Sequence, residues 1–191
     1  ESSRGGNALI TGFSLATGEV NPRAVALLWK AGEQSLVDDI RIQPNWGQMA
    51  YDGRRKDPFV KPANFDPDKY WDRQYPSIWV TDGGGGTLTG IWTHNTFAHA
   101  GLLVSNTSTP GKVYQMSAEH HVRNEIILDK VENWEFLAPQ TEQEQRDGLD
   151  TVSTDIRDSK NILFANYHGY RVTRSLAPEG AAVRVSNSSD I

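Results

Sequence analysis

The sequence predicts an all-β solenoid, a fold in which parallel strands from successive coils stack on one another. The first observation is a repeat in the last third of the chain, where an aliphatic residue recurs at Leu128, Ile156 and Val185. The steps of 28 and then 29 residues lie in the range typical of repeat architectures. A unit of this length cannot bury its own apolar face, so the units have to stack, and stacked strands form a parallel sheet.

The second observation is the chemistry inside each unit, which is that of strands and tight turns. Each unit holds a short polar residue followed directly by an apolar one: Asn133 and Trp134, Asn161 and Ile162, Asp190 and Ile191. Asn and Asp favour turns, and the apolar residue after them begins a second strand. No helical period runs through these units. The repeat places Trp134 at the position of Ile162, which predicts that this ring packs inside a coil.

The earlier part of the chain continues the strand pattern. Apolar alternation between turn residues predicts six further strands, at residues 8–15, 25–29, 35–42, 78–80, 88–92 and 101–104. Local propensity alone also allows a helix at residues 23–30, but Gly32 and the repeat context favour a strand there.

A long segment at residues 43–74 interrupts the pattern. It holds four prolines, many charges and six aromatic residues, and it is too long for an ordinary connection. The alternative to an ordered loop is a disordered excursion. Because of its aromatic content, we expect an inserted loop that packs on the flank of the solenoid and forms one wall of a cleft. Its Trp46, Tyr70 and Trp71 are predicted to bind substrate.

The glycine run at residues 83–86 resembles a phosphate-binding loop only superficially. It lacks the Gly-Lys-Ser/Thr ending, and no helical pattern follows it. Glycine also serves where the backbone needs positive φ or a close approach at a sharp corner, and we expect that role here.

Composition bounds the function classes. The 191 residues carry a net charge of −5 and contain no basic run, so a nucleic-acid partner is not expected. The absence of cysteine excludes disulfides and thiolate chemistry. No apolar run reaches the ~18 residues of a membrane span. Length and composition predict a single domain over residues 1–191.

The stretch at residues 117–126 is chemically the densest. If it is one continuous strand, alternation points Glu119, His121, Arg123 and Glu125 outward in a row. A carboxylate beside an imidazole and a guanidinium suits acid–base chemistry. The alternative is a solvated charged face. A metal site is not predicted, because the His-Glu-x-x-His motif is missing and adjacent histidines on a strand point to opposite sides.

A second polar patch follows from the repeat register. The repeat aligns residues 138–142 with residues 166–170, so Gln140 should neighbour His168, and Glu142 should neighbour Tyr170, on adjacent coils. Carboxylates, an imidazole and aromatic rings together suit sugar binding, because rings stack on pyranose faces while polar groups bind hydroxyls. The alternative is that the aromatic residues pack within or between coils.

Four segments together resemble a known group of proteins. They are AGEQSLVDD at residues 31–39, WVTDGGGGT at residues 79–87, SAEHHVRNE at residues 117–125 and FANYHGYR at residues 164–171. Nearly the whole chain resembles the pectate-lyase-like superfamily, in particular proteins related to glycoside hydrolase family 55. The resemblance implies a right-handed, single-stranded parallel β-helix that acts on or binds a polysaccharide outside the cytoplasm, in a secreted or periplasmic setting. It assigns no catalytic residue here.

The first functional hypothesis is a glycoside hydrolase, with a β-glucan as the favoured substrate. Glu119 and Glu142 would be the catalytic carboxylates, tuned by His121 and His168, with no cofactor and no metal. The residues expected to bind the sugar are Trp46, Tyr70, Trp71, Gln140, Tyr170, Arg123 and Arg171. The alternatives are a polysaccharide lyase, in which the two arginines would neutralise a uronate, and a non-catalytic carbohydrate-binding or adhesive β-helix.

The last expectation concerns the ends of the chain. The chain starts close to a strand and stops at Ile191, the first apolar residue of a strand. A solenoid needs capping ends, because its terminal coils otherwise expose apolar core and unpaired edges. From sequence we therefore expect a fragment of a longer solenoid, continued by further sequence or by another chain.

Overall fold

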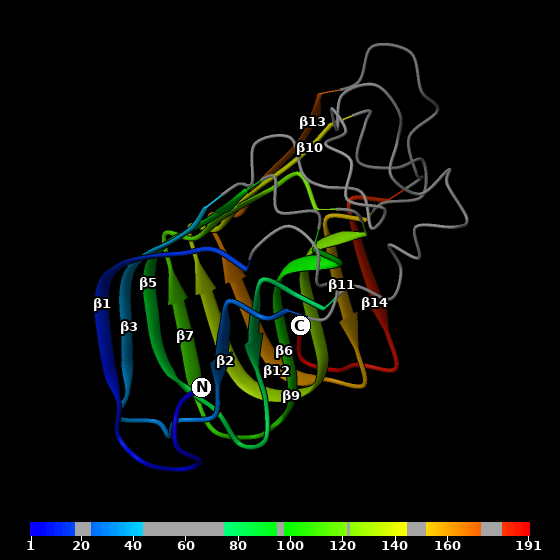
Figure 1. Cartoon of the computed structure of the whole chain (residues 1–191). Helices are drawn as coiled ribbons and strands as arrows, with labels where there is room; N and C mark the ends of the chain where they lie inside the picture. Colours follow the sequence, from blue (N-terminus) through cyan, green and yellow to red (C-terminus); the bar gives the residue numbers. More distant parts are fainter. Residues whose placement is uncertain (18–23, 44–74, 95–97, 122, 145–151, 173–180) are drawn as a thin grey trace.

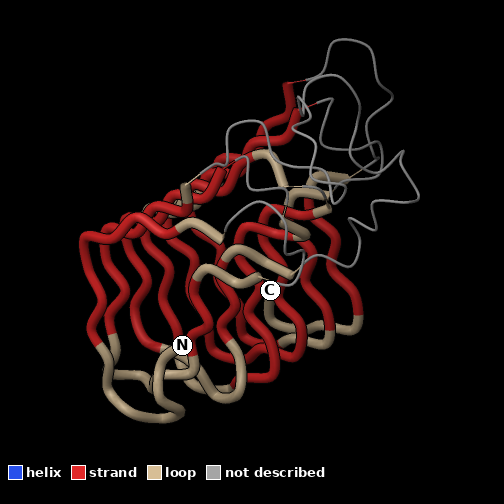
Figure 2. The backbone as a smooth tube through the Cα atoms, in the orientation of Figure 1, coloured by secondary structure: helices blue, strands red, loops and turns tan. Residues whose placement is uncertain are grey.

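A computed structural model describes residues 1–17, 24–43, 75–94, 98–121, 123–144, 152–172 and 181–191. In this part of the chain there are fourteen strands and no helix (Figures 1 and 2). None of these residues therefore forms a helical membrane span. Every strand pair is parallel, and the coils stack side by side, as the repeat predicted. Right-handed coiling stays a prediction.

One run of strands forms the first side of the solenoid. The members pair in chain order: β2 (Leu27–Trp29), β4 (Ile78–Val80), β6 (Ala100–Thr107), the first half of β9 (Asn124–Leu137), β11 (Thr154–Arg157) and β14 (Val183–Ser186). Leu128 pairs with Ile156, and Ile156 with Val185, which confirms the predicted repeat register.

The other strands form the second and third sides. On the second side lie β1 (Leu9–Leu15), β3 (Leu36–Ile42), the first part of β5 (Gly86–His94), β7 (Gly111–Tyr114), the second half of β9 and β12 (Lys160–Ala165). On the third side, the end of β5 pairs with β8 (Ser117–Glu119), β8 pairs with β10 (Gln140–Glu144), and β10 pairs with β13 (His168–Val172). In Figure 1, β10 and β13 lie along the inclined upper edge.

Residues at positive φ turn the chain between the first and second sides. Asn133 and Asn161 have φ of 65° and 54°, and Asp190 has 54°. Asn and Asp tolerate this left-handed conformation better than other non-glycine residues. The Asn161 Nδ2 donates a hydrogen bond of 2.7 Å to the Asn133 Oδ1 on the next coil. The predicted polar turn is confirmed, and its side chains also link neighbouring coils.

The glycine run lies at the corresponding corner of an earlier coil, where its residues are packed against backbone. A Cβ on Gly84 would lie 2.6 Å from the Trp29 carbonyl oxygen, and one on Gly86 would lie 2.5 Å from the Ser35 carbonyl oxygen. Gly86 also has a φ of +89°. The expected role in a close backbone approach is confirmed.

Large apolar side chains fill the interior between the three sides. Trp134 and Phe136 are fully buried, and Phe136 stacks on Phe164 of the next coil with ring centroids 4.6 Å apart. Gly111 leaves room for the Trp134 ring, since a Cβ there would lie 2.2 Å from it. The prediction that Trp134 packs inside a coil is therefore confirmed.

The predicted strands before residue 105 are all present. β1, β2, β3, β4, β5 and β6 fall on the six ranges read from the pattern, and residues 27–29 form a strand rather than a helix. The predicted loop at residues 43–74 lies, apart from Gln43, outside the described residues.

Candidate functional site

The third side of the solenoid carries a row of titratable side chains on its outer face. His94 on β5 is in register with Glu119 on β8, and Glu119 is in register with Glu142 on β10. Tyr170 on β13 continues the row, as the repeat predicted for its pairing with Glu142. Because coils are ~4.8 Å apart, residues in register on neighbouring strands can touch.

A second row runs beside the first, and each of its residues comes two positions earlier on the same strand. It consists of Trp92, Ser117, Gln140 and His168, each in register with the next. The predicted pairing of Gln140 with His168 is confirmed. The two rows together make one polar face that follows the solenoid axis.

The carboxylate of Glu119 is held by two neighbours from the second row. Its Oε1 accepts a hydrogen bond of 2.6 Å from the Ser117 hydroxyl and one of 3.2 Å from the Gln140 Nε2. The side chain is partly buried. Two donors on one oxygen fix the orientation of the carboxylate.

The carboxylate of Glu142 lies between Tyr170 and His120. Its Oε2 accepts a hydrogen bond of 2.5 Å from the Tyr170 hydroxyl, and its Oε1 lies 4.0 Å from the His120 Nε2. One side-chain ligand atom from each of Glu119, His120 and Glu142 lies within 4.8 Å of the other two. We call these three residues the Glu-His-Glu cluster. The structure therefore brings together the two carboxylates that the sequence singled out.

The histidine beside this pair is His120 and not His121, which corrects the predicted outward row. β8 ends at Glu119, and His120 has a φ of 62°. A left-handed residue breaks the alternation of a strand, so His120 stays at the outer face and His121 turns inward. His121 and Glu125 are both completely buried. The prediction that these two side chains point outward is wrong.

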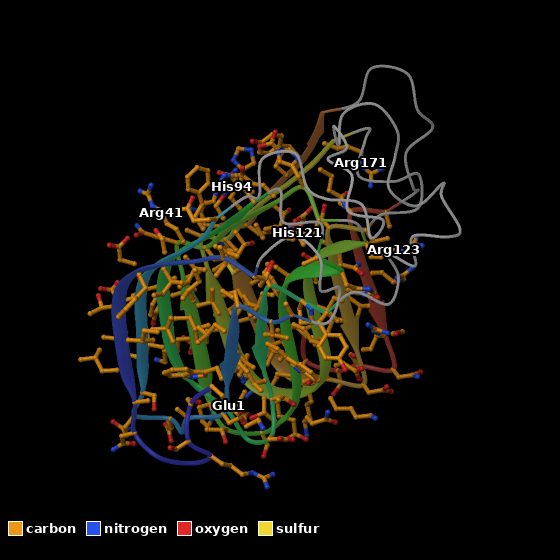
Figure 3. All side chains as sticks on the ribbon, viewed as in Figure 1. Glu1, Arg41, His94, His121, Arg123 and Arg171 are labelled. Carbon is orange, nitrogen blue, oxygen red and sulfur yellow. The ribbon has the colours of Figure 1, made fainter. Side chains whose placement is uncertain are left out.

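Inside the fold, His121 and Glu125 bond to each other. The His121 Nδ1 is hydrogen-bonded to the Glu125 Oε2, and the His121 backbone N–H donates to Oε1 at 3.2 Å. Burial, with His120 and His94 nearby, lowers the pKa of His121 well below 6.5. The His121 imidazole is therefore neutral, and its Nδ1–H donates to the Glu125 carboxyl group. Figure 3 shows His121 between the inclined face and the first side.

His94 and Trp92 form the next part of the face toward the N-terminal coils. The two rings stack with centroids 3.9 Å apart, and the Arg41 guanidinium lies 5.5 Å from the Trp92 ring centroid. Burial lowers the pKa of His94, an effect that Glu119 opposes and that His120 and Arg41 reinforce. At neutral pH the His94 imidazole is therefore uncharged.

The remaining predicted site residues lie at different distances from the cluster. Tyr170 and Gln140 adjoin it, whereas His168 packs edge-on against Tyr170, with ring centroids 5.3 Å apart. Arg171 points to the opposite side of β13, where its guanidinium donates two hydrogen bonds to the Gln143 Oε1. His168 is the one predicted catalytic residue that stays outside the cluster while sharing its outer face.

Arg123 and the aromatic residues of the inserted loop are not part of the described cluster. Arg123 lies just before β9, where its backbone N–H donates to the His99 carbonyl. In Figure 3 it is set apart from Arg41 and His94. Trp46, Tyr70 and Trp71 lie outside the described residues, so their predicted contact with substrate stays a prediction.

Sequence reasoning missed four contributors to this face: Trp92, His94, Ser117 and His120. The His120–His121 doublet indicated that one histidine faces outward, but alternation assigned that position to His121. His94 and Ser117 come from coils whose spacing differs from the 28-residue repeat, so no register could be assigned to them in advance.

Comparisons with protein-family models, with curated proteins and with solved structures find no match for this chain. Of the resemblance to the pectate-lyase-like superfamily, the structure therefore supports the parallel β-solenoid fold and not the family relationship. The fold alone does not define an activity, so the chemistry of the site depends on the geometry of its own residues. Paired carboxylates with a neighbouring imidazole and an exposed tyrosine ring can protonate, attack and hold a sugar.

Proposed function

We propose that this chain is a glycoside hydrolase that cleaves a polysaccharide outside the cytoplasm, in a secreted or periplasmic setting. The observation that carries the proposal is the position of Glu119 and Glu142 on paired strands, with carboxylate oxygens within 4.8 Å of each other. Glycosidases use two carboxyl groups on either side of the scissile bond. A β-glucan is the substrate to test first.

The separation of the two carboxylates favours the retaining mechanism. Retaining enzymes place their carboxyl groups about 5–5.5 Å apart, whereas inverting enzymes leave about 6.5–9.5 Å for a water molecule. One oxygen of each carboxylate lies within 4.8 Å of the other, which is closer to the retaining spacing than to the inverting one. One carboxylate then attacks the anomeric carbon, and the other first protonates the leaving oxygen and then activates water.

The surroundings of the two carboxylates indicate which one is the nucleophile and which one is the acid/base. Glu119, held on one oxygen by Ser117 and Gln140, is the nucleophile, because a nucleophile must keep one position relative to the sugar. Glu142 is the acid/base, because the His120 imidazole beside it offers a route for its proton. Tyr170, 38% exposed, presents ring surface on which a pyranose can stack.

The outer face also fits an extended substrate. Its two rows run from His94 and Trp92 through the cluster to Tyr170 and His168. Arg41 on the preceding coil is in register with Trp92 and extends the second row. Side chains that can hydrogen-bond or stack therefore recur on each coil along the solenoid axis, which suits a chain of sugars more than a single sugar.

The test is release of reducing ends from a panel of polysaccharides, with a β-glucan included. Wild type should release them, and Glu119→Gln and Glu142→Gln should each lose at least about a hundredfold in kcat, since each amide keeps the shape but not the chemistry. Glu135→Gln is the matched control. Glu135 lies on the outer face of the second side, 3.7 Å from Lys112, and its substitution should leave the rate unchanged.

Two other outcomes would replace the proposal. Products with unsaturated sugar ends would identify a polysaccharide lyase, and saturable binding without turnover would identify a binding module. The lyase has less support, because the Arg171 guanidinium is directed to Gln143 rather than to the cluster.

A separate experiment tests the role of Glu119. Glu119→Ala should regain part of its activity when azide is added, because the small anion replaces the missing nucleophile and yields a glycosyl azide. The azide product of Glu119→Ala should have inverted configuration, because azide makes the only displacement. A retained azide from Glu119→Ala, with an inverted one from Glu142→Ala, would reverse the two roles, because azide then opens a covalent intermediate only when the acid/base is missing.

A further inference from the structure

We propose that Glu119, His120 and Glu142 also form a binding site for one divalent transition-metal ion of the Zn²⁺ type. One carboxylate or imidazole atom from each residue lies within 4.8 Å of the other two. Four-coordinate Zn²⁺ with ligands at about 2.0–2.2 Å holds those ligands about 3.3–3.6 Å apart. Closing the cluster around an ion therefore requires shifts of about 1 Å, which side-chain rotations supply.

The type of ligand selects the class of ion. Ca²⁺ prefers six to eight oxygen ligands and Mg²⁺ prefers oxygen in an octahedron, whereas an imidazole with carboxylates suits Zn²⁺ and its transition-metal neighbours. The chain has no cysteine, so no thiolate site competes for such an ion. The cluster thus favours Zn²⁺ over the alkaline-earth cations.

His94 supplies a second imidazole at the edge of the cluster. It is in register with Glu119 on the adjoining coil, and its Nδ1 is buried with no hydrogen-bond partner in the described part of the chain. His94 is not among the residues whose ligand atoms lie within 4.8 Å of one another, so its ring would have to move toward the ion to become a fourth ligand.

The residues that would support the ligands are also present. The Ser117 hydroxyl donates to Glu119, and the Tyr170 hydroxyl donates to Glu142. Such hydrogen bonds orient metal-binding carboxylates, and their loss typically weakens metal affinity about 10–100-fold. The arrangement around the Glu-His-Glu cluster thus matches what a built metal site needs.

The ion would occupy the same carboxylates that the proposed function assigns to hydrolysis, so metal and substrate should exclude each other. That consequence rests on the proposed function, but the site itself does not. Metal affinity is measured without any polysaccharide. A failed binding experiment leaves the hydrolase standing, and an inactive protein leaves the metal site standing.

The experiment is calorimetric titration of metal-stripped protein at pH 7 with ZnCl₂, CaCl₂ and MgCl₂ in turn. Wild type should bind one Zn²⁺ per chain, at least about tenfold more tightly than Ca²⁺ or Mg²⁺. The informative variant is His120→Asn, because Asn tolerates the positive φ of this position and removes only the imidazole. It should bind Zn²⁺ at least about tenfold more weakly.

His168→Asn is the matched control, since His168 is an exposed histidine on the same face but outside the cluster. It should bind Zn²⁺ as wild type does, with both variants keeping the wild-type circular dichroism. Co²⁺ should give the intense visible bands of a tetrahedral site in wild type and lose them in His120→Asn. Equal Zn²⁺ affinity in His120→Asn and wild type, or no preference over Ca²⁺, would overturn the proposal.

Discussion

The corner at Asn133 and Asn161 and the corner at His120 turn the chain with the same backbone conformation, a non-glycine residue at positive φ. At the first corner the residue type repeats from coil to coil, and the side chains bond along the stack. At the second corner the residue is an unrepeated histidine, with a carboxylate on each of two coils beside it. We call the first the structural corner, because its repetition holds the fold, and the second, beside which we propose the site, the chemical corner.

The two corners also differ in what lies beneath them. Behind His120, the His121–Glu125 pair is buried at the level of the core. Behind Asn133, the buried residue is the apolar Trp134. A buried polar pair is costly to break, so the chemical corner depends on one specific contact while the structural corner depends on many weak ones.

The largest expected effect comes from breaking that contact. His121→Ala leaves the buried Glu125 carboxyl group without its imidazole, which should lower the free energy of unfolding by about 3–5 kcal/mol. Urea denaturation measures the change. A loss below about 1 kcal/mol would show that the pair does not hold the chemical corner.

A smaller effect is expected at the repeated corner. Asn133→Ala removes the hydrogen bond from Asn161 and places alanine at positive φ, which together should lower the free energy of unfolding by about 2 kcal/mol. Asn133→Gly keeps the backbone preference and should lose about 1 kcal/mol, for the side-chain hydrogen bonds to Asn161 and Ser108 alone. Equal losses in the two variants, measured in the same denaturation experiment, would show that the backbone conformation contributes nothing.

The pH dependence of stability separates the two corners without any substitution at the cluster. The pKa of His121 is lowered by burial in the folded chain, whereas an unfolded histidine takes up its proton near 6.5. The unfolded state then binds more protons as the pH falls below 6.5, so stability decreases there by up to about 1.4 kcal/mol per pH unit. His94, with its lowered pKa, acts in the same direction.

Melting temperatures across pH 5 to 8 measure this slope. His121→Gln should show a shallower fall than wild type below pH 6.5, and Asn133→Gly should keep the wild-type slope. A stability that rises as the pH drops through this window would show that His121 is charged in the folded chain.

The smallest effects are expected on the outer side of the chemical corner. Glu119→Gln and Glu142→Gln replace partly exposed carboxylates and should change the free energy of unfolding by no more than about 0.5 kcal/mol each. The same denaturation series measures them. A loss above about 2 kcal/mol in either variant would make that carboxylate a structural residue and remove the contrast between the corners.

The same comparison explains how much of the molecule could be predicted from sequence. The fold followed from Leu128, Ile156 and Val185, because a coil can only stack in a register that keeps its apolar residues inside. The polar turns at Asn133 and Asn161 followed too, since few residue types tolerate positive φ. Even the pairing of Glu142 with Tyr170 followed from the repeat alone.

The orientation of the histidines could not be predicted. Alternation assumes that every residue of a strand is extended, and His120 is not. No Gly or Asn stands at that position to signal a turn, so His121 was assigned to the outer face while it is buried. The pairing of His94 with Glu119 escaped prediction because their coils do not follow the 28-residue spacing.

The most direct test of the account is the anomeric configuration of the first product, followed by NMR during hydrolysis of a β-glucan or of whichever polysaccharide the chain cleaves. Because the Glu119 and Glu142 oxygens lie within 4.8 Å of each other, the account predicts that the new reducing end keeps the configuration of the bond that was broken. An inverted product would contradict it, since inverting enzymes hold their carboxyl groups about 6.5–9.5 Å apart.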